Sequence, residues 1–392
     1  MEQNIEKKSK LFSSIISFTW LVYLFLFFTQ AVIYHTFGYG DFKYIFEIVF
    51  AVLFCLILGI DLLKRSFNSK NYTIILVGFL IRVLFLFASR FNWFYVIHAD
   101  ADGLAFHNMA VKNLDLGYIE YFHGGWYTPF ITLLYVFIGP MMMPVTCLNF
   151  ASGMTIIYLL KKILQKIGIT RKNMQIVLCI ASFCYLFESL SVLIMRDVLL
   201  IFFIFVSAYY FVEWLRTGNL KNFLCSFIPI FIGMHFHSGI LSFVVIYPIV
   251  LVLYSKKIMS FKFTKKRIEI LFIVAILVLI SCYFIFQHTY VEGKMKYALD
   301  SLTSGKKGLL WSSGTYRGGS AYLSFLRGLT NPLWLPIVLP ITTVYLAFSP
   351  MPWNWRGLSD ILAFAFDGAI YLYFFVAIFK RIKLINNERK IL

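Results

Sequence analysis

The sequence predicts an all-α, polytopic integral membrane protein with about 10–12 transmembrane helices, forming one domain over residues 1–392. Three observations predict this fold class. Hydrophobic residues make up 60% of the chain and charged residues 14%, which is more apolar surface than a soluble domain can bury. Apolar runs of roughly twenty residues, the length of a helix that crosses a bilayer, recur from end to end. The ten-residue polar–apolar alternation of a membrane β-barrel is absent.

The apolar runs define the candidate spans in chain order. The first run is too long for the core of a signal peptide, so we expect a retained helix. The run 128–160 is too long for one straight helix, and we expect Gly139, Pro140 and Pro144 to break it. The proline-rich run 321–349 is expected to cross an even number of times. The other candidate spans are 12–35, 44–63, 73–95, 174–195, 198–215, 222–234, 240–254, 268–286 and 359–379.

Lys and Arg residues predict the orientation of these spans. They cluster at the N-terminus, after every second span and at the C-terminus, which is the pattern of cytoplasmic segments. We therefore expect both termini in the cytoplasm and the chain in the cytoplasmic (inner) membrane of a bacterium. Basic loops that face anionic lipid explain the net charge of +18, so no nucleic acid is expected as a partner. The cytoplasmic loops hold no glycine-rich phosphate loop, which favours chemistry on the external side.

The predicted first external loop, 96–127, carries an unusual density of polar side chains. Asp100 and Asp102 stand there in a chain with only 18 acidic residues. Carboxylates at a membrane are costly to place, so this pair is the first candidate for a catalytic site. Four further polar residues in the same loop are expected to support it, namely His98, His107, Glu120 and His123.

The spacing within this loop predicts an amphipathic helix at the membrane interface. Asp102, Phe106 and Ala110 are four residues apart and share one helix face, and Gly117 is expected to end the helix. As an alternative, the two carboxylates only cap this helix, because a helix N-terminus favours negative charge. Capping accounts for one aspartate, but it does not account for both.

Three arginines are candidate ligands for a phosphate group. Arg196 is enclosed by apolar residues at the external membrane edge, although it could instead pair with Asp197 to anchor a tight turn. Arg317 and Arg327 stand among small and aromatic residues in the external basic loop 287–331. The guanidinium fork suits phosphate oxygens, and the alternative is a solvated loop that contacts anionic headgroups.

Two histidines and one glutamate complete the candidate residues. His235 and His237 separate two short spans, and His237 could bind a divalent cation (Mg²⁺ or Mn²⁺) together with Asp100 and Asp102. The alternative is a pair of ordinary interfacial turn histidines. Glu188 lies within the span 174–195, where it could handle protons or contact a neighbouring helix.

The first external loop resembles that of GT-C-type membrane glycosyltransferases. The resemblance is carried by Asp102-x3-Phe106-x3-Ala110-x6-Gly117 and by Gly125-Trp-Tyr-Thr-Pro129, and it is general elsewhere. Enzymes of this class transfer sugars from polyprenyl-phosphate or pyrophosphate carriers, such as undecaprenyl carriers, on the extracytoplasmic side. Wzy-like polysaccharide polymerases share this logic. The resemblance implies a GT-C-like fold and a catalytic role for Asp102, supported by Asp100. Two extra N-terminal spans and the lack of a large C-terminal soluble domain depart from the class.

The expected function is therefore an enzyme, a hexosyltransferase-type glycosyltransferase of the cell envelope. It would use a polyprenyl-(pyro)phosphate-linked saccharide to polymerise repeat units of a surface polysaccharide (O-antigen, capsule or exopolysaccharide). A carboxylate would take the proton of the acceptor hydroxyl, and cationic groups would stabilise the departing phosphate. Membrane lipids and other polysaccharide-assembly proteins are the expected partners. Two alternatives stay open: a GT-C transferase that adds one sugar, and a lipid-linked oligosaccharide flippase or other transporter.

Overall fold

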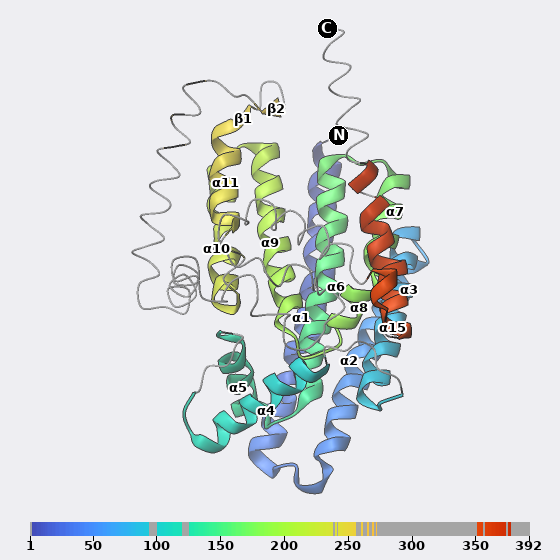
Figure 1. The fold of residues 1–392 in the computed structure, drawn as a ribbon, viewed down its shortest axis with the longest axis vertical. Coiled ribbons are helices and arrows are strands. Elements are labelled where there is room, and N and C mark those ends of the chain that lie inside the picture. The colour runs from blue at the N-terminus through green and yellow to red at the C-terminus, as the bar shows by residue number, and fades with distance from the viewer. Residues whose placement is uncertain are drawn as a thin grey trace. The chain divides into compact units, whose positions relative to one another are not determined.

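The computed structural model describes residues 2–93, 100–119, 125–237, 240, 242–255, 260–261, 265, 269, 272, 351–355, 357–373 and 375–377. These residues are almost entirely helical, which confirms the all-α fold class (Figure 1). The exception is a pair of two-residue antiparallel strands, β1 (Tyr254–Ser255) and β2 (Ser260–Phe261). The chain divides into two compact units, 1–182 with 187–291 and 183–186 with 292–392. The predicted spans 268–286 and 321–349 lie outside the described residues, apart from Glu269 and Phe272.

The first unit is built from helices of very different lengths. Five segments in the described part of the chain are long and apolar enough to cross a membrane: Ile15–Phe37, Gly40–Ser66, Lys70–Arg90, Met142–Ile167 and Arg196–Thr217. Apart from residues 183–186, which belong to the second unit, the helices of this unit are α1 (Glu2–Phe37), η1 (Gly40–Phe42), α2 (Lys43–Ser66), α3 (Lys70–Arg90), α4 (Asp100–Leu116), α5 (Tyr127–Ile138), α6 (Met142–Ile167), α7 (Arg171–Phe183), α8 (Tyr185–Leu190), α9 (Arg196–Thr217), α10 (Leu220–Phe236) and α11 (Ser242–Leu253).

The long apolar run 128–160 is broken where the sequence predicts. Helix α5 ends at Ile138, and Gly139 follows it with φ 71°, a conformation that side-chain-bearing residues rarely adopt. Helix α6 begins at Met142. The expectation for Pro144 is wrong, because this residue lies in the first turn of α6, where the missing N–H would have no helical partner.

The predicted span 174–195 is not one helix. Helix α7 ends at Phe183, α8 ends at Leu190, and residues 191–195 are not helical. At the end of α8, Glu188 contacts Arg82 of α3 in a buried ion pair, and the Ser191 hydroxyl donates a hydrogen bond to the Glu188 carbonyl at 2.7 Å. The end of the predicted span, residues 191–195, is a run of hydrogen-bonded turns that leads into α9.

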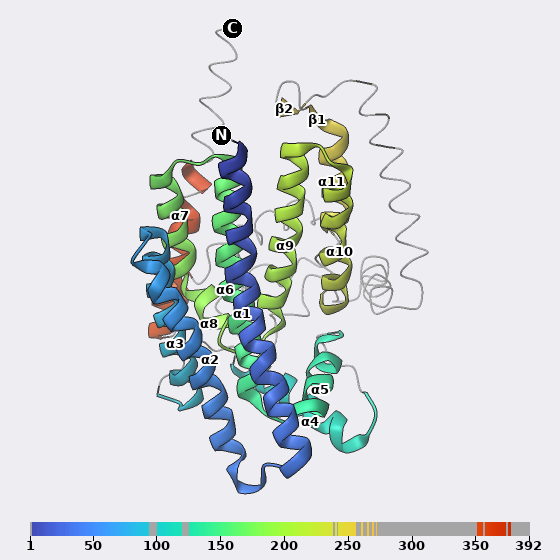
Figure 2. The same cartoon turned by 180° about the vertical axis from the view of Figure 1, so that it is seen from behind.

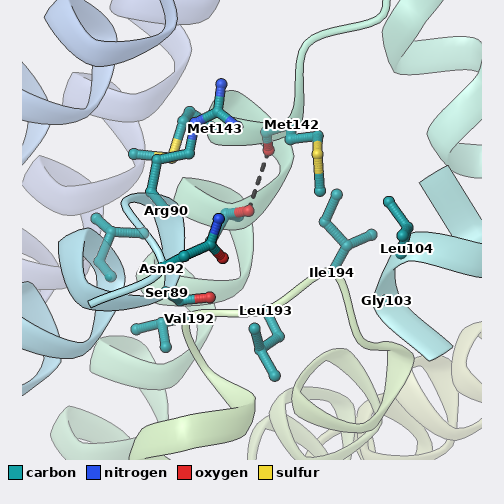
Figure 3. A pocket seen from close by; sticks show the side chains of 12 residues that line it. Ser89, Arg90, Asn92, Gly103, Leu104, Met142, Met143, Val192, Leu193 and Ile194 are labelled. Atoms are coloured by element: carbon teal, nitrogen blue, oxygen red, sulfur yellow. Dashed lines mark hydrogen bonds between the residues drawn. The ribbon is translucent and has the colours of Figure 1, made fainter. Parts of the chain in front are cut away.

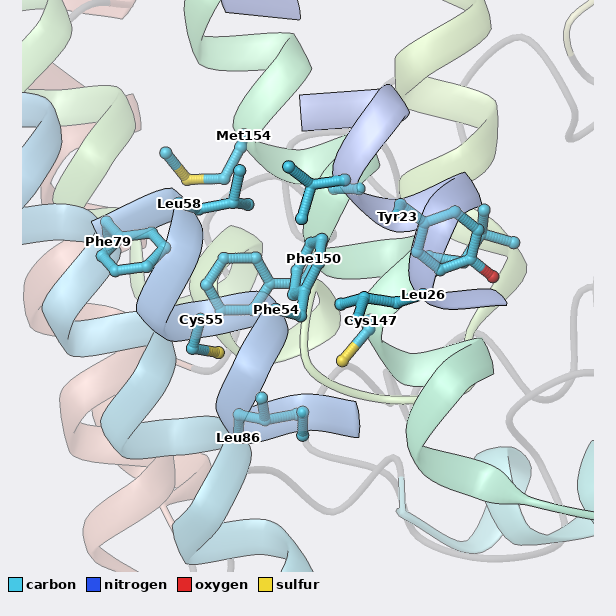
Figure 4. Packing of buried hydrophobic residues seen from close by; sticks show 14 of the residues in the cluster. Tyr23, Leu26, Phe54, Cys55, Leu58, Phe79, Leu86, Cys147, Phe150 and Met154 are labelled. Carbon is cyan, nitrogen blue, oxygen red and sulfur yellow. The ribbon is translucent and has the colours of Figure 1, made fainter. Parts of the chain in front are cut away.

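Helix α6 lies at the centre of the first unit. It is buried along most of its length, and its Phe150 ring makes edge contacts with Phe54 of α2 at 5.8 Å and with Phe79 of α3 at 5.4 Å (Figure 4). Tyr23 of α1 joins the same apolar cluster. The core thus forms around α6, while α1, α2 and α3 keep many apolar side chains exposed, as expected for helices that face lipid.

The helix ends of the first unit separate by charge. The N-terminus, the α6–α7 turn and the α9–α10 turn lie at one end, which we call the basic end (Figures 1 and 2). The α1–α2 turn, α4 and the α5–α6 break lie at the opposite end, which we call the α4 end. Helix α4 runs obliquely across the direction of α1 and α6 there, as expected for an interfacial helix.

The second unit contributes η6 (Pro352–Asn354), α15 (Leu358–Ala363) and a π-helical turn, η7 (Phe364–Gly368). Asp367 of this turn accepts hydrogen bonds from Cys184 Sγ at 3.0 Å and from the Leu186 amide at 2.8 Å. The side chain therefore ties the π turn to the segment 183–186 of the same unit.

Candidate functional site

Helix α4 carries the predicted catalytic carboxylates in its first turn. The helix begins at Asp100 and gives way to Gly117, which has φ 68° and ends it as predicted. Phe106 and Ala110 are buried, and the Phe106 ring packs edge-on against Tyr127 at 5.0 Å. Asp102 is exposed, so its carboxylate is accessible from outside the protein.

The first turn of α4 lies against the segment that leads to Arg196. A Cβ atom added at Gly103 would sit 3.5 Å from the carbonyl oxygen of Ile194, so the backbones approach closely at this point. Residue 103 follows Asp102 directly, and Ile194 precedes Arg196 by two positions. The structure thus brings two distant parts of the predicted site to the same region of the α4 end.

The buried side chain of Asn149 helps to hold the turn segment 191–195 in place. Asn149 of α6 donates from Nδ2 to the carbonyl oxygens of Leu193 at 2.6 Å and Met195 at 2.8 Å. Helix α9 then begins at Arg196 with Asp197 beside it. Both charged residues lie within electrostatic reach of Tyr127 on α5. The position of Arg196 therefore depends on a fixed turn and not on a free loop.

A cavity of about 390 Å³ opens between these elements (Figure 3). Gly103 and Leu104 of α4 lie on one side of it, and Arg90 and Asn92 lie on the other. Its remaining lining is mostly apolar and comes from α3, α6 and the turn segment 191–195: Leu86, Ser89, Met142, Met143, Thr146, Val192, Leu193 and Ile194. Such a mixture of apolar walls and a few polar groups is typical of binding sites for amphipathic ligands.

Arg90 is the cationic side chain on this wall. Its Nη2 atom lies 2.5 Å from Glu47 Oε2 of α2, and its guanidinium lies over the Tyr44 ring at 4.7 Å. Glu47 also accepts a hydrogen bond from the Met142 amide at 3.0 Å, which fixes the start of α6. The predicted span 73–95 ends here because Asn92 turns into a left-handed conformation, with φ 54°.

His107 faces the same cluster from the next turn of α4. Its Nδ1 atom lies 2.6 Å from the Tyr135 hydroxyl. Burial, helped by the positive charges of Lys43 and Arg90, lowers the pKa of His107 from 6.5 to about 4. His107 is therefore a neutral imidazole near pH 7, and Lys43, Arg90 and His107 come from three helices that meet at the α4 end.

The predicted histidines of α10 lie near the start of α5. The His235 carbonyl accepts a hydrogen bond from the Trp126 amide at 3.0 Å, and the two rings are 5.5 Å apart. His237 follows the last turn of α10 and is exposed. Among the described residues, no three His, Cys, Asp or Glu side chains form a group that could hold a metal ion. The predicted cation site of Asp100, Asp102 and His237 is described only in part, since the Asp100 side chain is outside that set.

Several predicted site residues lie outside the described part of the chain. They are His98, Glu120, His123, Arg317 and Arg327. Their expected roles stay predictions.

The structure adds residues that sequence reasoning missed. Arg82 Nε lies 3.1 Å from Glu188 Oε2 and 3.1 Å from Ser191 Oγ, with both charged side chains 1% exposed. Arg90 and Asn92 were missed as lining residues of the cavity. A signal was available for Arg82, because a charge inside an apolar span is costly unless it has a partner. For the second pair, nothing in the sequence identified Glu47 as the partner of Arg90.

Comparisons of this chain with protein-family models, with curated proteins and with solved structures found no match. The residues and geometry of the α4 end are therefore the only basis for a function.

Proposed function

We propose that this protein is a membrane glycosyltransferase that acts on polyprenyl-(pyro)phosphate-linked saccharides at the extracytoplasmic face. In this proposal, the chain is a GT-C-like enzyme of the bacterial inner membrane with both termini in the cytoplasm. Its principal reaction is the polymerisation of repeat units of a surface polysaccharide.

The observation that carries the proposal is the cavity beside the carboxylate-bearing turn. Gly103 and Leu104 line the cavity immediately after Asp102, and Arg90 lies on its opposite side. A solvent-accessible carboxylate next to an amphipathic cavity with a cation suits a substrate that joins sugar, phosphate and hydrocarbon. The helix ends that line the cavity belong to the α4 end, which lies opposite the basic turns, and this supports an external site.

The proposed mechanism uses the described side chains as follows. Asp102 accepts the proton of the acceptor hydroxyl as its oxygen attacks the anomeric carbon of the donor sugar. The bond between that carbon and the phosphate oxygen breaks, and its electron pair leaves with the (pyro)phosphate. Arg196, held by the segment that Asn149 fixes, offsets the negative charge that develops on the leaving group.

The alternative functions require charged side chains at different places in the protein. A transporter carries its charged side chains along a path through the membrane, where they pair with one another. Arg82 and Glu188 form one such buried pair in the described part of the first unit, whereas the carboxylate-bearing turn and the cavity lie at the α4 end, which favours an enzyme. Addition of a single sugar requires the same site as polymerisation, and only the products separate these two reactions.

The test is mass spectrometry of lipid-linked glycans from the native host carrying Asp102→Asn. We expect a complete single repeat unit on the lipid carrier to accumulate and long surface chains to disappear, with a loss of at least about a hundredfold in polymer, since general base catalysis contributes 10²–10⁴-fold. Asp115→Asn is the matched control, because it makes the same change at an exposed position near the other end of α4.

Each other outcome has a clear meaning. A glycan that lacks one sugar would identify a transferase that adds a single residue. A wild-type profile at a normal protein level would remove Asp102 from the mechanism and contradict the proposal.

A further inference from the structure

A ladder of three aromatic rings leads out of the end of α3. Phe87 stacks on Phe91 with 6.1 Å between the ring centroids and 16° between the ring planes, and Phe91 stacks on Trp93 at 5.5 Å and 23°. Trp93 is the last ring of this ladder, and it is 63% exposed. An indole that packs on a second ring is held in place and still presents a flat apolar surface.

The backbone at the end of α3 fixes the place of Trp93. Asn92 has φ 54°, which is in the left-handed region. Its amide donates to the Ser89 carbonyl at 3.3 Å, and the Trp93 amide donates to the Ala88 carbonyl at 3.0 Å. This is the hydrogen-bond pattern of a Schellman motif, in which asparagine can replace the usual glycine. Trp93 therefore has a defined position directly after Asn92, which lines the cavity.

Two polar side chains that are free to bind a ligand lie on the same wall of the cavity. Ser89 and Asn92 both line the cavity, on the side opposite α4 (Figure 3). Within the ranges that the structure describes, neither the Ser89 hydroxyl nor the Asn92 side-chain amide has a hydrogen-bond partner. A hydroxyl and a primary amide together offer both donors and acceptors, which suits a ligand with several hydroxyl groups.

The charges around the cavity balance each other, which favours an uncharged ligand. The cations Lys43, Arg90 and Arg196 are matched by the carboxylates of Glu47, Asp102 and Asp197. The Arg90 guanidinium is bound to Glu47 at 2.5 Å, so an anion would have to displace this carboxylate. His107 adds no charge near pH 7. A surface without excess charge attracts neither cations nor anions over a distance.

An uncharged sugar ring matches these features together. A pyranose carries hydroxyl groups around its edge and apolar C–H groups on its faces. One face can pack on the Trp93 indole while the hydroxyl groups bond to Ser89 and Asn92. A hydrocarbon chain has no use for a free amide and a free hydroxyl. A quaternary ammonium, which also packs on aromatic rings, gains nothing further from balanced charges.

We propose that Ser89, Asn92 and Trp93 form a subsite that binds one uncharged sugar ring of a glycan, independently of any lipid carrier. This inference deepens the proposed function and rests on it for the source of the glycan. The sugar would lie on the α3 side of the cavity, across from Gly103 and the carboxylate-bearing turn of α4. The alternative is that Trp93 only anchors α3 at the membrane interface.

The test measures saccharide binding by the full-length protein in nanodiscs of phosphatidylglycerol and phosphatidylethanolamine, whose headgroups contain no sugar. The probe is a lipid-free oligosaccharide released from the surface polysaccharide of the native host. Saturation-transfer NMR detects the bound sugar protons, and titration gives the Kd. We expect the oligosaccharide to bind, and we expect neither choline nor inorganic phosphate to displace it. Absence of binding to the wild type would overturn the inference.

Tryptophan variants separate sugar binding from membrane anchoring. Trp93→Ala should weaken binding about three- to tenfold because the stacking surface is lost, and Trp93→Phe should restore most of it. Trp126→Ala is the matched control, since this indole is also exposed at the α4 end but packs by His235 and does not line the cavity. If both alanine variants lower the melting temperature alike and leave binding unchanged, Trp93 is an interfacial anchor and the inference is wrong.

Polar variants test the hydrogen bonds without disturbing the turn. Glycine adopts the left-handed conformation freely, so Asn92→Gly removes the amide and keeps the Schellman motif. Asn92→Gly and Ser89→Ala should each weaken binding about two- to tenfold, because one or more hydrogen bonds are lost. Thermal unfolding confirms that each variant remains folded. Wild-type affinity in both variants would remove Ser89 and Asn92 from the subsite and contradict the proposal.

The binding assay also separates this inference from the proposed function. Asp102→Asn should bind the oligosaccharide like the wild type, whatever its effect on glycans in the host. Normal glycans in Asp102→Asn together with Trp93-dependent binding would overturn the catalytic role of Asp102 and leave the subsite standing. Loss of polymer in Asp102→Asn without Trp93-dependent binding would overturn only the subsite.

Discussion

The buried ion pair of Arg82 and Glu188 shows what a single charge costs inside this protein. Both side chains are almost fully buried, and Arg82 also contacts Ser191 Oγ and lies over the Phe187 ring at 4.9 Å. Removing one member of such a pair leaves a charge without compensation, whereas replacing both by apolar groups of similar volume is often tolerated.

We therefore predict opposite outcomes for single and double substitutions. Arg82→Met alone should lower the free energy of unfolding by about 3–5 kcal/mol, and Arg82→Met with Glu188→Leu should recover most of that loss. Unfolding in detergent, followed by circular dichroism, measures both. A double variant less stable than Arg82→Met would show that the pair itself is needed.

The imidazole of His107 makes a second prediction at this scale. Its pKa is lowered from 6.5 to about 4 in the folded protein. The unfolded chain therefore binds more protons between these values, so the free energy of unfolding should fall as the pH falls through this window. The variant His107→Gln should therefore lose less stability than the wild type between about pH 7 and about pH 4.5, which melting temperatures at the two pH values measure. His35→Gln removes one imidazole at an exposed position near the end of α1 and is the control for the substitution itself.

At the scale of elements, close backbone contacts decide which helices pack together. A Cβ atom at Gly78 of α3 would lie 2.8 Å from both Ser182 Cβ and the Ser182 carbonyl oxygen of α7. The backbone cannot yield as a flexible side chain would, so this glycine sets the approach of α3 and α7. The same approach brings Arg82, one turn further along α3, to Glu188.

Gly78→Ala should consequently push these helices apart. We expect a loss of about 1–3 kcal/mol in stability, which is typical of overpacking, despite the better helix propensity of alanine. Gly59→Ala in the adjacent α2 is the matched control, because its Cβ would meet only the Phe79 ring at 3.3 Å. Equal stability of Gly78→Ala and wild type would mean that α3 and α7 do not pack as closely as described.

At the scale of the whole molecule, the separation of the basic end from the α4 end predicts the orientation in the membrane. Thr170, in the α6–α7 turn, and Tyr118, just after α4, are both exposed at opposite ends of the first unit. Tyr118→Cys should react with a membrane-impermeant thiol reagent in intact cells, and Thr170→Cys should react only after permeabilisation. The wild type gives the background, and the reverse pattern would place the cavity in the cytoplasm.

The sequence by itself determined the features that depend on local composition. Apolar runs of membrane-spanning length identified the long helices, Gly139 broke the run 128–160, and Gly117 ended α4, since these effects arise from hydrophobicity and from backbone sterics within a few residues. The carboxylate-bearing turn of α4 was found in the same way. The turns at 191–195 were not, because the local pattern there is apolar, while the contacts that hold Ser191, Leu193 and Met195 come from side chains distant in the chain.

Only the tertiary structure decided how these pieces form a site. Arg82 meets Glu188, Arg90 meets Glu47, and Gly103 meets Ile194 across long separations in the chain. Nothing in the local pattern of a span specifies its neighbour, because lipid and protein are equally apolar surroundings for most of its side chains. The cavity beside the first turn of α4 and the cation that lines it exist only because α3, α4, α6 and the turn segment 191–195 pack together at one end.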